Sequence, residues 1–251
     1  MNILKPSISI KIKPIQSSSL ETEGLFGETV EIFDNHLEWV YCKLLTDNYY
    51  GWIKKKNLGH LKPVTHRVVS PRSFLLKKKD IKSTCINYLP LGAQLSIKTV
   101  INDWAEVDLN KDVKNKIAYI PSKHISNINS SIKDWVSTAE SLIGTPYKWG
   151  GRDSIGLDCS ALLQLSYQTY GQNIPRNTID QVMLQKEKVN DINELDRGCV
   201  IFWEGHVGIM IDKFNCVHAN AFHMKTVIEP LDDIINRMGE KNKIIKMMNF
   251  N

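Results

Sequence analysis

A cysteine at the start of a predicted helix is the residue of this sequence that is best placed for nucleophilic chemistry. Glycines and a proline from Gly144 to Gly156 exclude a helix before Cys159, and apolar residues at helical spacing follow it up to Gly171. Cys159 is therefore expected to be the first residue of a helix, with Asp158 as the N-cap. Unpaired N–H groups and the dipole at a helix start favour thiolate over thiol, so the pattern predicts a reactive cysteine.

Two histidines further along the chain supply the base that a cysteine nucleophile needs. His206 begins the apolar run HVGIMID, and His218 ends the next strand-like run. Adjacent strands place two such histidines side by side, so that one accepts the thiol proton and the other orients the first. Pairing of thiolate with imidazolium lowers a cysteine pKa from about 8.5 to about 3–4, so we expect Cys159 to be ionised at neutral pH. His223 is expected to be a strand-end residue.

Five blocks around these residues resemble the NlpC/p60 cysteine peptidases, papain-like enzymes that cut bacterial cell-wall peptides. The blocks TPYKWGG, LDCSALLQ, PRNTIDQ, GHVGIMID and VHANAFHM follow each other in the order of the family. The resemblance implies that Cys159 is the nucleophile, His206 the general base and His218 the residue that orients His206. The chain departs from the family pattern at Ala161, which is usually glycine, and at Cys199, which is usually aspartate.

Residues beside the nucleophile are candidates for stabilising the oxyanion and for binding substrate. The backbone N–H of Cys159 is an expected oxyanion donor, and the hydroxyl of Tyr147 is a candidate second donor, with plain packing in the glycine-rich loop as its alternative role. The resemblance implies that Asp158 and Ser160 form a pocket for the free amino group of an L-alanine. Trp149 is a further cleft candidate, with packing as the favoured role.

The sequence before the catalytic region predicts two small β domains. Short alternating strands separated by turn residues run through residues 17–62 and again through residues 63–125. Both stretches resemble bacterial SH3-like domains, and LFGETVEIFDNHLEWVYC with LGAQLSIKTVINDWAEVD forms an internal repeat. In family members with such a domain, one of its loops helps to bind the amino terminus of the substrate. By that resemblance Glu28 and Tyr49 are candidate substrate ligands, with Tyr50 as a competing choice and plain structural roles as the alternative.

The expected fold class is α+β, with a papain-like catalytic domain preceded by two small all-β SH3-like barrels. A helical half that carries the cysteine is expected to pack on an antiparallel sheet that carries the histidines. Arg176 and Gln181, in the PRNTIDQ block, are expected to brace the loop beside the cleft. The expected boundaries are an N-terminal segment at 1–16, SH3-like domains at 17–62 and 63–125, and the peptidase domain at 126–251.

Composition restricts the partners and cofactors of this chain. Its 251 residues carry a net charge of +5 and include five cysteines without a C-x-x-C pair. Such cysteines indicate neither a structural zinc site nor a disulfide framework, and the thiol chemistry requires no metal or organic cofactor. The basic runs lie beside turn residues without a nucleic-acid-binding motif, so no nucleic-acid partner is expected. The absence of a signal peptide or of ~20 consecutive apolar residues predicts no membrane association and a cytoplasmic location.

The leading hypothesis from the sequence is a cytoplasmic endopeptidase that acts on murein-derived peptides. The resemblance implies the substrate L-Ala-γ-D-Glu-diaminopimelate, with a free L-Ala amine and cleavage after D-Glu, as in the recycling of wall peptides. A secreted hydrolase of intact peptidoglycan, a non-catalytic wall-binding protein and an acyl-transfer enzyme on the same fold are the alternatives. The presence of all three catalytic side chains weighs against the binding protein.

Overall fold

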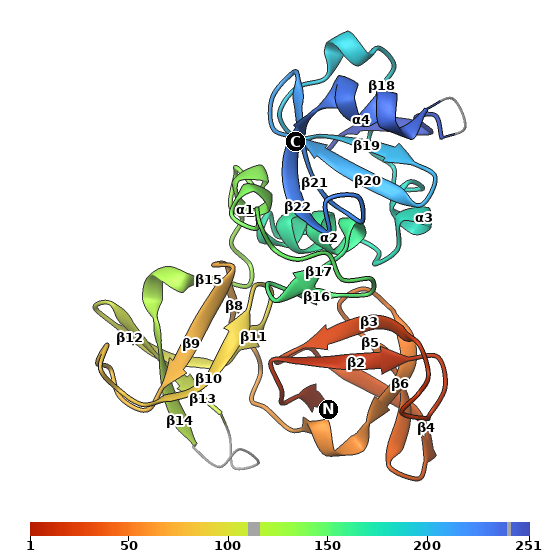
Figure 1. Ribbon diagram of the computed structural model, residues 1–251. Coiled ribbons are helices and arrows are strands. Elements are labelled where there is room, and N and C mark those ends of the chain that lie inside the picture. Colours follow the sequence, from red (N-terminus) through yellow and green to blue (C-terminus); the bar gives the residue numbers. More distant parts are fainter. Residues whose placement is uncertain (110–115, 240–241) are drawn as a thin grey trace. The chain divides into compact units, whose positions relative to one another are not determined.

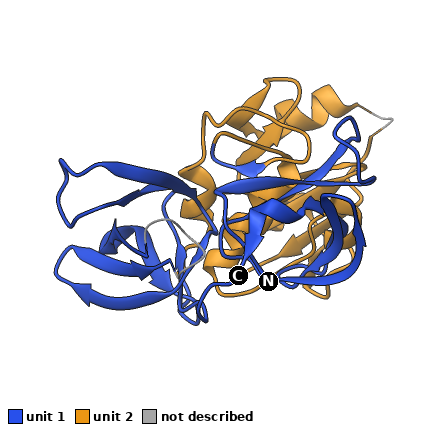
Figure 2. Cartoon of the chain, turned by 90° about the horizontal axis from the view of Figure 1, so that it is seen from below, with its two compact units in different colours: residues 1–131, 152–154 blue, residues 132–151, 155–251 orange. Residues whose placement is uncertain are grey.

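The computed structural model describes the whole chain except residues 110–115 and 240–241. The chain divides into two compact units, coloured separately in Figure 2. Unit 1 consists of residues 1–131 and 152–154, and unit 2 consists of residues 132–151 and 155–251.

A five-stranded antiparallel sheet with the order β3-β2-β6-β5-β4 forms the first part of unit 1 (Figure 1). Alternate residues of its strands, including Ile8 and Ile10 of β2, fill one core. Strand β2, which lies within residues 1–16, therefore contributes to this sheet and its core. The strands of this part are β1 (Asn2–Ile3), β2 (Ser7–Lys11), β3 (Leu20–Leu25), β4 (Val30–His36), β5 (Trp39–Leu44), β6 (Tyr50–Lys54) and β7 (Leu58–Gly59).

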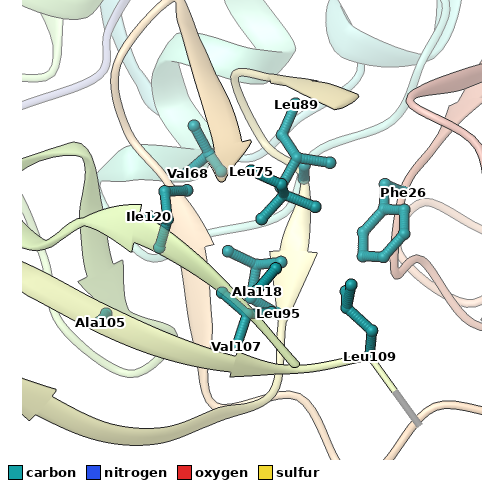
Figure 3. Close-up of a cluster of buried hydrophobic side chains, with 11 residues drawn as sticks. Phe26, Val68, Leu75, Leu89, Leu95, Ala105, Val107, Leu109, Ala118 and Ile120 are labelled. Carbon is teal, nitrogen blue, oxygen red and sulfur yellow. The ribbon is translucent and has the colours of Figure 1, made fainter. Parts of the chain in front are cut away.

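The second part of unit 1 contains a five-stranded sheet with the order β10-β9-β14-β13-β12 and a three-stranded sheet with the order β11-β8-β15. Figure 3 shows the apolar side chains that converge between them, joined by Phe26 from the loop after β3. The next residue, Gly27, has φ +82°, and a Cβ there would clash with the carbonyl of Gln94. Only glycine allows this close approach. The strands are β8 (His66–Val68), β9 (Arg72–Leu76), β10 (Cys85–Pro90), β11 (Gln94–Leu95), β12 (Ile97–Ile101), β13 (Trp104–Asp108), β14 (Ile117–Pro121) and β15 (Ile125–Asn127).

The two β domains end in the same way, as the internal repeat in the sequence predicts. In the first, β6 is followed by the 3-10 helix η1 (Lys55–Asn57) and then by the short strand β7. In the second, β14 is followed by the 3-10 helix η2 (Ser122–His124) and then by β15. The segments YYGWIKKKNL and KIAYIPSKHI are thus equivalent in structure as well as in pattern.

Unit 2 contains a six-stranded antiparallel sheet with the strand order β18-β23-β19-β20-β21-β22 (Figure 1). Helices pack against this sheet. Helix α2, which is buried along its whole length, contacts β20, β21 and α1, and α4 contacts β22. The arrangement is α+β, as predicted. Its elements are α1 (Val136–Glu140), β17 (Gly156–Leu157), α2 (Cys159–Thr169), α3 (Thr178–Gln181), β18 (Glu187–Val189), η3 (Ile192–Glu194), β19 (Cys199–Trp203), β20 (His206–Met210), β21 (Asn215–Asn220), β22 (Lys225–Pro230), α4 (Leu231–Met238) and β23 (Lys246–Asn249); β16 (Arg152–Asp153) belongs to unit 1.

An aromatic cluster secures the end of the chain in unit 2. Phe250 is fully buried, and its ring centroid lies 5.0 Å from that of Tyr167 on α2 and 6.2 Å from that of Trp135. Trp135 in turn packs edge-on against Tyr167 at 5.2 Å. The end of the chain is therefore held to α2 by aromatic packing, and the last strand, β23, is held by backbone pairing with β18 and β19.

Replacement of Phe250 by alanine is expected to destabilise unit 2 by about 3–5 kcal/mol, because it removes a buried ring and leaves a cavity. Urea unfolding followed by circular dichroism measures this loss. Phe214→Ala is the matched control, since Phe214 is 75% exposed and its removal leaves no cavity. Equal unfolding midpoints for the two variants would contradict the packing role of Phe250.

Candidate active site

The cysteine of the predicted site opens α2, where the sequence places it. Asp158 is the N-cap, with an extended backbone (φ −104°, ψ 179°), and its carboxylate accepts the N–H of Ala161 at 2.9 Å. The loop before it is tight, because a Cβ on Gly151 would clash with the carbonyl of Gly156. The glycines therefore shape the turn that delivers Cys159 to the helix start.

The sulfur of Cys159 lies against the start of β20. Its Sγ is 4.0 Å from the carbonyl oxygen of Gly205, and it accepts a hydrogen bond from the backbone N–H of Val207. These two residues flank His206 in the chain. The packing of α2 on β20 thus brings the predicted nucleophile to the strand end that carries the predicted base.

Two histidines and a glutamate form a hydrogen-bonded row across three strands. Nε2 of His206 on β20 lies 2.8 Å from Nδ1 of His218 on β21, and Nε2 of His218 lies 2.7 Å from Oε2 of Glu229 on β22. A Cβ on Gly208 would clash with the sulfur of Cys216, so the glycine permits the close pairing of β20 with β21. The sequence predicted the two histidines but not Glu229.

Burial sets the protonation of the nucleophile and the base. Desolvation, and then the charge of Asp158, raise the pKa of Cys159 to about 11. Desolvation, and then the neighbouring His218, lower the pKa of His206 to about 3. In this structure the pair is therefore a neutral thiol beside a neutral imidazole. These directions run against the expected resting thiolate, because burial of the sulfur outweighs the N–H donors of the helix start, and the charge state of the Cys159–His206 pair stays a prediction.

The Asp158 carboxylate is buried and already fully paired. Arg176 donates to both of its oxygens, at 3.0 and 2.7 Å, and the backbone N–H of Gly150 donates to Oδ2 at 2.9 Å. Ser160 donates to Oδ1 at 3.1 Å and accepts from Arg176 at 2.7 Å. With the N-cap bond from Ala161, these donors occupy the lone pairs of a carboxylate. An ammonium group reaches this charge only if one of the present donors moves away.

The PRNTIDQ block forms the brace that the sequence predicts, and Arg176 does more than brace. The amide of Gln181, on α3, donates to the carbonyl of Ser160 at 3.0 Å and to that of Pro175 at 2.9 Å. Arg176, 3% exposed, balances the negative charge beside the nucleophile. The sequence analysis predicted the brace but not this charge pairing, because Arg176 and Asp158 lie 18 positions apart.

Tyr147 and Trp149, the two aromatic candidates, differ in their exposure. Burial, and then the charges of Cys159 and Asp158, raise the pKa of Tyr147 to about 12, so its hydroxyl keeps the proton that an oxyanion donor needs. Trp149 is 72% exposed, which corrects its expected packing role. Its indole is free to contact a bound molecule.

Glu28, a candidate substrate ligand from the first β domain, is a buried ion-pair partner in the structure. It is 1% exposed, and Arg152 donates to its two oxygens at 3.0 Å each. The backbone N–H of Leu25 adds a third bond at 2.7 Å. Arg152 also donates to the carbonyl of Glu23 at 2.8 Å. The Glu28 carboxylate therefore has a structural function within unit 1, and its role toward substrate stays a prediction.

Tyr49, the other candidate from this domain, is half-buried. Its hydroxyl donates to Oε2 of Glu21 at 3.1 Å, and its backbone N–H donates to Oδ1 of Asp47 at 3.1 Å. The competing choice, Tyr50, is 47% exposed and stacks on Tyr41 with ring centroids 6.2 Å apart. A role of Tyr49 in binding substrate stays a prediction.

Among the residues that the structure describes, no group of three or more His, Cys, Asp or Glu side chains is arranged to hold a metal ion. All five cysteines are free, and Cys85 is the exposed one. Within the same described part of the chain, no helix is long and apolar enough to cross a membrane.

The protonation of the pair predicts slow alkylation of Cys159. At pH 6, iodoacetamide is expected to modify the buried thiol more slowly than the exposed thiol of Cys85, because the thiolate is the reacting form. Peptide mass spectrometry at timed intervals measures both sites in one sample, so Cys85 serves as the internal reference. Faster modification of Cys159 than of Cys85 at this pH would instead indicate a resting ion pair.

Neutralisation of Glu28 is expected to destabilise the protein. Glu28→Gln leaves the buried Arg152 without its charge partner, which costs about 3–5 kcal/mol. The midpoint of urea unfolding measures the effect, and Glu31→Gln is the control because that strand residue is exposed. A midpoint for Glu28→Gln equal to that of Glu31→Gln would refute the structural function of the ion pair.

Comparison with known proteins agrees with this geometry. Residues 144–238 match the NlpC/P60 family, and residues 13–58 match the bacterial dipeptidyl-peptidase Sh3 domain. The chain is 27% identical over 226 residues to the gamma-D-glutamyl-L-lysine dipeptidyl-peptidase of Bacillus subtilis (strain 168), covering 80% of this chain and 72% of the relative. It is 26% identical over 244 residues to dipeptidyl-peptidase 6 of Lysinibacillus sphaericus, covering 88% of each chain.

A solved structure shares the fold over nearly the whole chain. An NlpC/P60 family protein from Bacillus cereus ATCC 10987 superposes with a TM-score of 0.85 at 19% identity, covering 99% of this chain and 98% of that protein. The matched family region contains the cysteine, both histidines and Glu229 described above. Residues 144–238 are therefore an NlpC/P60 domain of the cysteine peptidase type, and a bacterial dipeptidyl-peptidase Sh3 domain at residues 13–58 precedes it.

Proposed function

We propose that this peptidase cuts free murein-derived peptides between γ-D-Glu and the following diamino acid, and that it requires a free L-Ala amine at their amino terminus. The observation that carries the proposal is the placement of the Cys159 thiol at the start of β20, where His206 and His218 form a hydrogen-bonded pair. The name of the Bacillus subtilis relative, a gamma-D-glutamyl-L-lysine dipeptidyl-peptidase, supports the γ-D-glutamyl bond as the target. Such peptides occur during recycling in the cytoplasm, which is the location that we propose.

The chemistry follows from the neutral thiol–imidazole pair. As Sγ of Cys159 attacks the carbonyl carbon, His206 accepts the thiol proton and becomes an imidazolium. The carbonyl oxygen becomes an oxyanion, for which the N–H of Cys159 and the hydroxyl of Tyr147 are the donors. His206 then protonates the amine of the diamino acid, which leaves, and the γ-D-Glu carbonyl remains as a thioester on Cys159.

Water completes the reaction. His206 accepts a proton from a water molecule that attacks the thioester, and the thiol leaves with the proton returned to it. Each proton that His206 accepts creates a positive charge at a partly buried site. The pKa of His206, lowered to about 3, shows how strongly the resting site disfavours that charge, so a bound anionic intermediate has to compensate it.

Recognition of the amine depends on the Asp158 site. The carboxylate is saturated by Arg176, Ser160 and backbone donors, so an incoming ammonium group displaces one of them. Ser160 is the donor that is displaced most easily, because its hydroxyl rotates without moving the backbone. Intact wall has no free L-Ala amine and is therefore a poor substrate under this proposal.

The test is mass-spectrometric detection of the cleavage of L-Ala-γ-D-Glu-meso-diaminopimelate and of the corresponding L-Lys peptide, each with a free and with an acetylated amine. Only the free-amine peptides are expected to be cut. Cys159→Ala is expected to lower the rate by on the order of 10⁶-fold, to below detection, and Cys85→Ala is the matched control.

Other outcomes reject separate parts of the proposal. Cleavage of the acetylated peptides would refute amine recognition by Asp158 and Ser160 and leave Cys159 as the nucleophile. Cleavage of purified sacculi would favour a hydrolase of intact peptidoglycan. Transfer of the acyl group to an added amine in place of water would favour acyl transfer.

A further inference from the structure

A partly buried carboxylate behind the histidine pair is unused by the mechanism above. Glu229 ends the row from His206 through His218, and its side chain is 12% exposed. Arg237 on α4 donates to both of its oxygens, at 2.8 and 2.7 Å. His223 places Nε2 2.9 Å from Oε1. Glu229 is thus contacted by side chains from three places: His218 on β21, His223 in the turn after β21, and Arg237 on α4.

The charge on Glu229 is well defined. Burial alone would raise its pKa, but hydrogen bonds from Arg237, then His223 and His218, lower the pKa to about 2. Burial, as the largest effect, lowers the pKa of His218. The pair at neutral pH is therefore a carboxylate beside a neutral imidazole, which carries a single N–H.

The hydrogen-bond row determines which nitrogen carries each proton. A carboxylate only accepts, so the proton of His218 lies on Nε2, pointing at Glu229. Nδ1 of His218 is then an acceptor, and the proton of His206 lies on Nε2, pointing at His218. Nδ1 of His206 is left with its lone pair, as a base that takes the Cys159 proton requires.

Asn220 would impose the opposite arrangement if Glu229 carried no charge. The Nδ2 group of Asn220 lies 3.0 Å from the same Nε2 of His218, and its Oδ1 is fixed by the N–H of His223 at 2.7 Å. The amide therefore presents a donor to His218. Donation from Asn220 would move the His218 proton to Nδ1 and the His206 proton to its own Nδ1, which removes the base.

We propose that Glu229, clamped by Arg237, is a positioning residue of this peptidase that fixes the tautomers of His218 and His206 against the opposing donor Asn220. The inference rests on the proposed function in that the base it prepares is the one that activates Cys159. It extends the Cys–His–His row by a fourth member that touches neither the thiol nor the substrate. It also gives α4 a part in the chemistry, since Arg237 holds the carboxylate.

Glu229→Gln is expected to lower kcat by about 10- to 100-fold, with KM changed by less than about twofold, because an orienting partner acts on the reaction step and not on binding. The substrate is the free-amine L-Ala-γ-D-Glu peptide. Asp233→Asn, which neutralises an exposed carboxylate on the adjacent α4, is the matched control and is expected to retain the parent kcat.

Asn220→Asp in the Glu229→Gln background is the rescue variant. It places an acceptor with a negative charge 3.0 Å from Nε2 of His218, where the amide donor stood. We expect the log kcat of the double variant to lie at least halfway from that of Glu229→Gln back to that of the parent protein. A merely structural role of Glu229 predicts no rescue, because the contacts with Arg237 stay broken in the double variant.

The tautomers are measured directly by long-range ¹H–¹⁵N correlation spectra of histidine-labelled resting protein, with signals assigned by His206→Gln and His218→Gln variants. The expected result is Nε2–H on both residues in the parent protein and Nδ1–H on His218 in Glu229→Gln. Parent protein with Nδ1–H on His218, an unchanged kcat in Glu229→Gln, or lost activity without rescue would overturn the inference. The spectra need no substrate, so they test it even if the proposed peptide is not cleaved.

Discussion

Burial of the thiol and of the base is the constraint on which the rest of the catalytic domain depends. Cys159 is enclosed by the start of α2 and the start of β20, and both it and His206 are desolvated enough to be neutral at rest. A neutral pair has no charge attraction to align it. Alignment has to come from packing and from directed hydrogen bonds, which explains why the histidines are fixed across three strands instead of lying on a mobile loop.

Three carboxylates that are largely removed from water are each stabilised by a two-pronged ion pair with an arginine, here called a fork. Arg176 pairs with Asp158 beside the nucleophile, Arg237 pairs with Glu229 behind the histidines, and Arg152 pairs with Glu28 inside unit 1. A carboxylate removed from water is costly unless a partner of opposite charge and suitable shape accompanies it. The planar guanidinium meets that need with two parallel hydrogen bonds. In each case the fork also fixes the direction in which the carboxylate points.

These ion pairs give Asp158 and Glu229 different roles in the site. Asp158 caps α2 and carries a charge that is balanced before any substrate arrives, so its contribution to amine binding depends on the exchange of donors. Glu229 is paired with Arg237 and also accepts the N–H of His218, and it thereby controls a proton at a distance from the reaction. The exposed Trp149 is the part of the loop that is free to adapt to a ligand.

Local pattern was sufficient to predict much of this protein. Glycine-rich sequence followed by helical periodicity located Cys159 at a helix start with Asp158 as its cap, and strand-like runs located His206 and His218. The alternation of apolar and polar residues in the first half of the chain predicted two small β domains and the repeat between them. It indicated a strand within residues 1–16 but left its partners open, because the pairing of β2 with β3 and β6 depends on residues elsewhere in the sheet.

The sequence by itself determined the fold class, the nucleophile candidate and the histidine pair, because capping, periodicity and turn formation act between residues a few positions apart. Only the tertiary structure decided the charges. Arg152 and Glu28 are 124 positions apart, and Arg176 and Asp158 are 18 apart, so no local pattern pairs them. The neutral state of Cys159 and the role of Glu229 likewise depend on burial, which is a property of the packed chain and not of any segment.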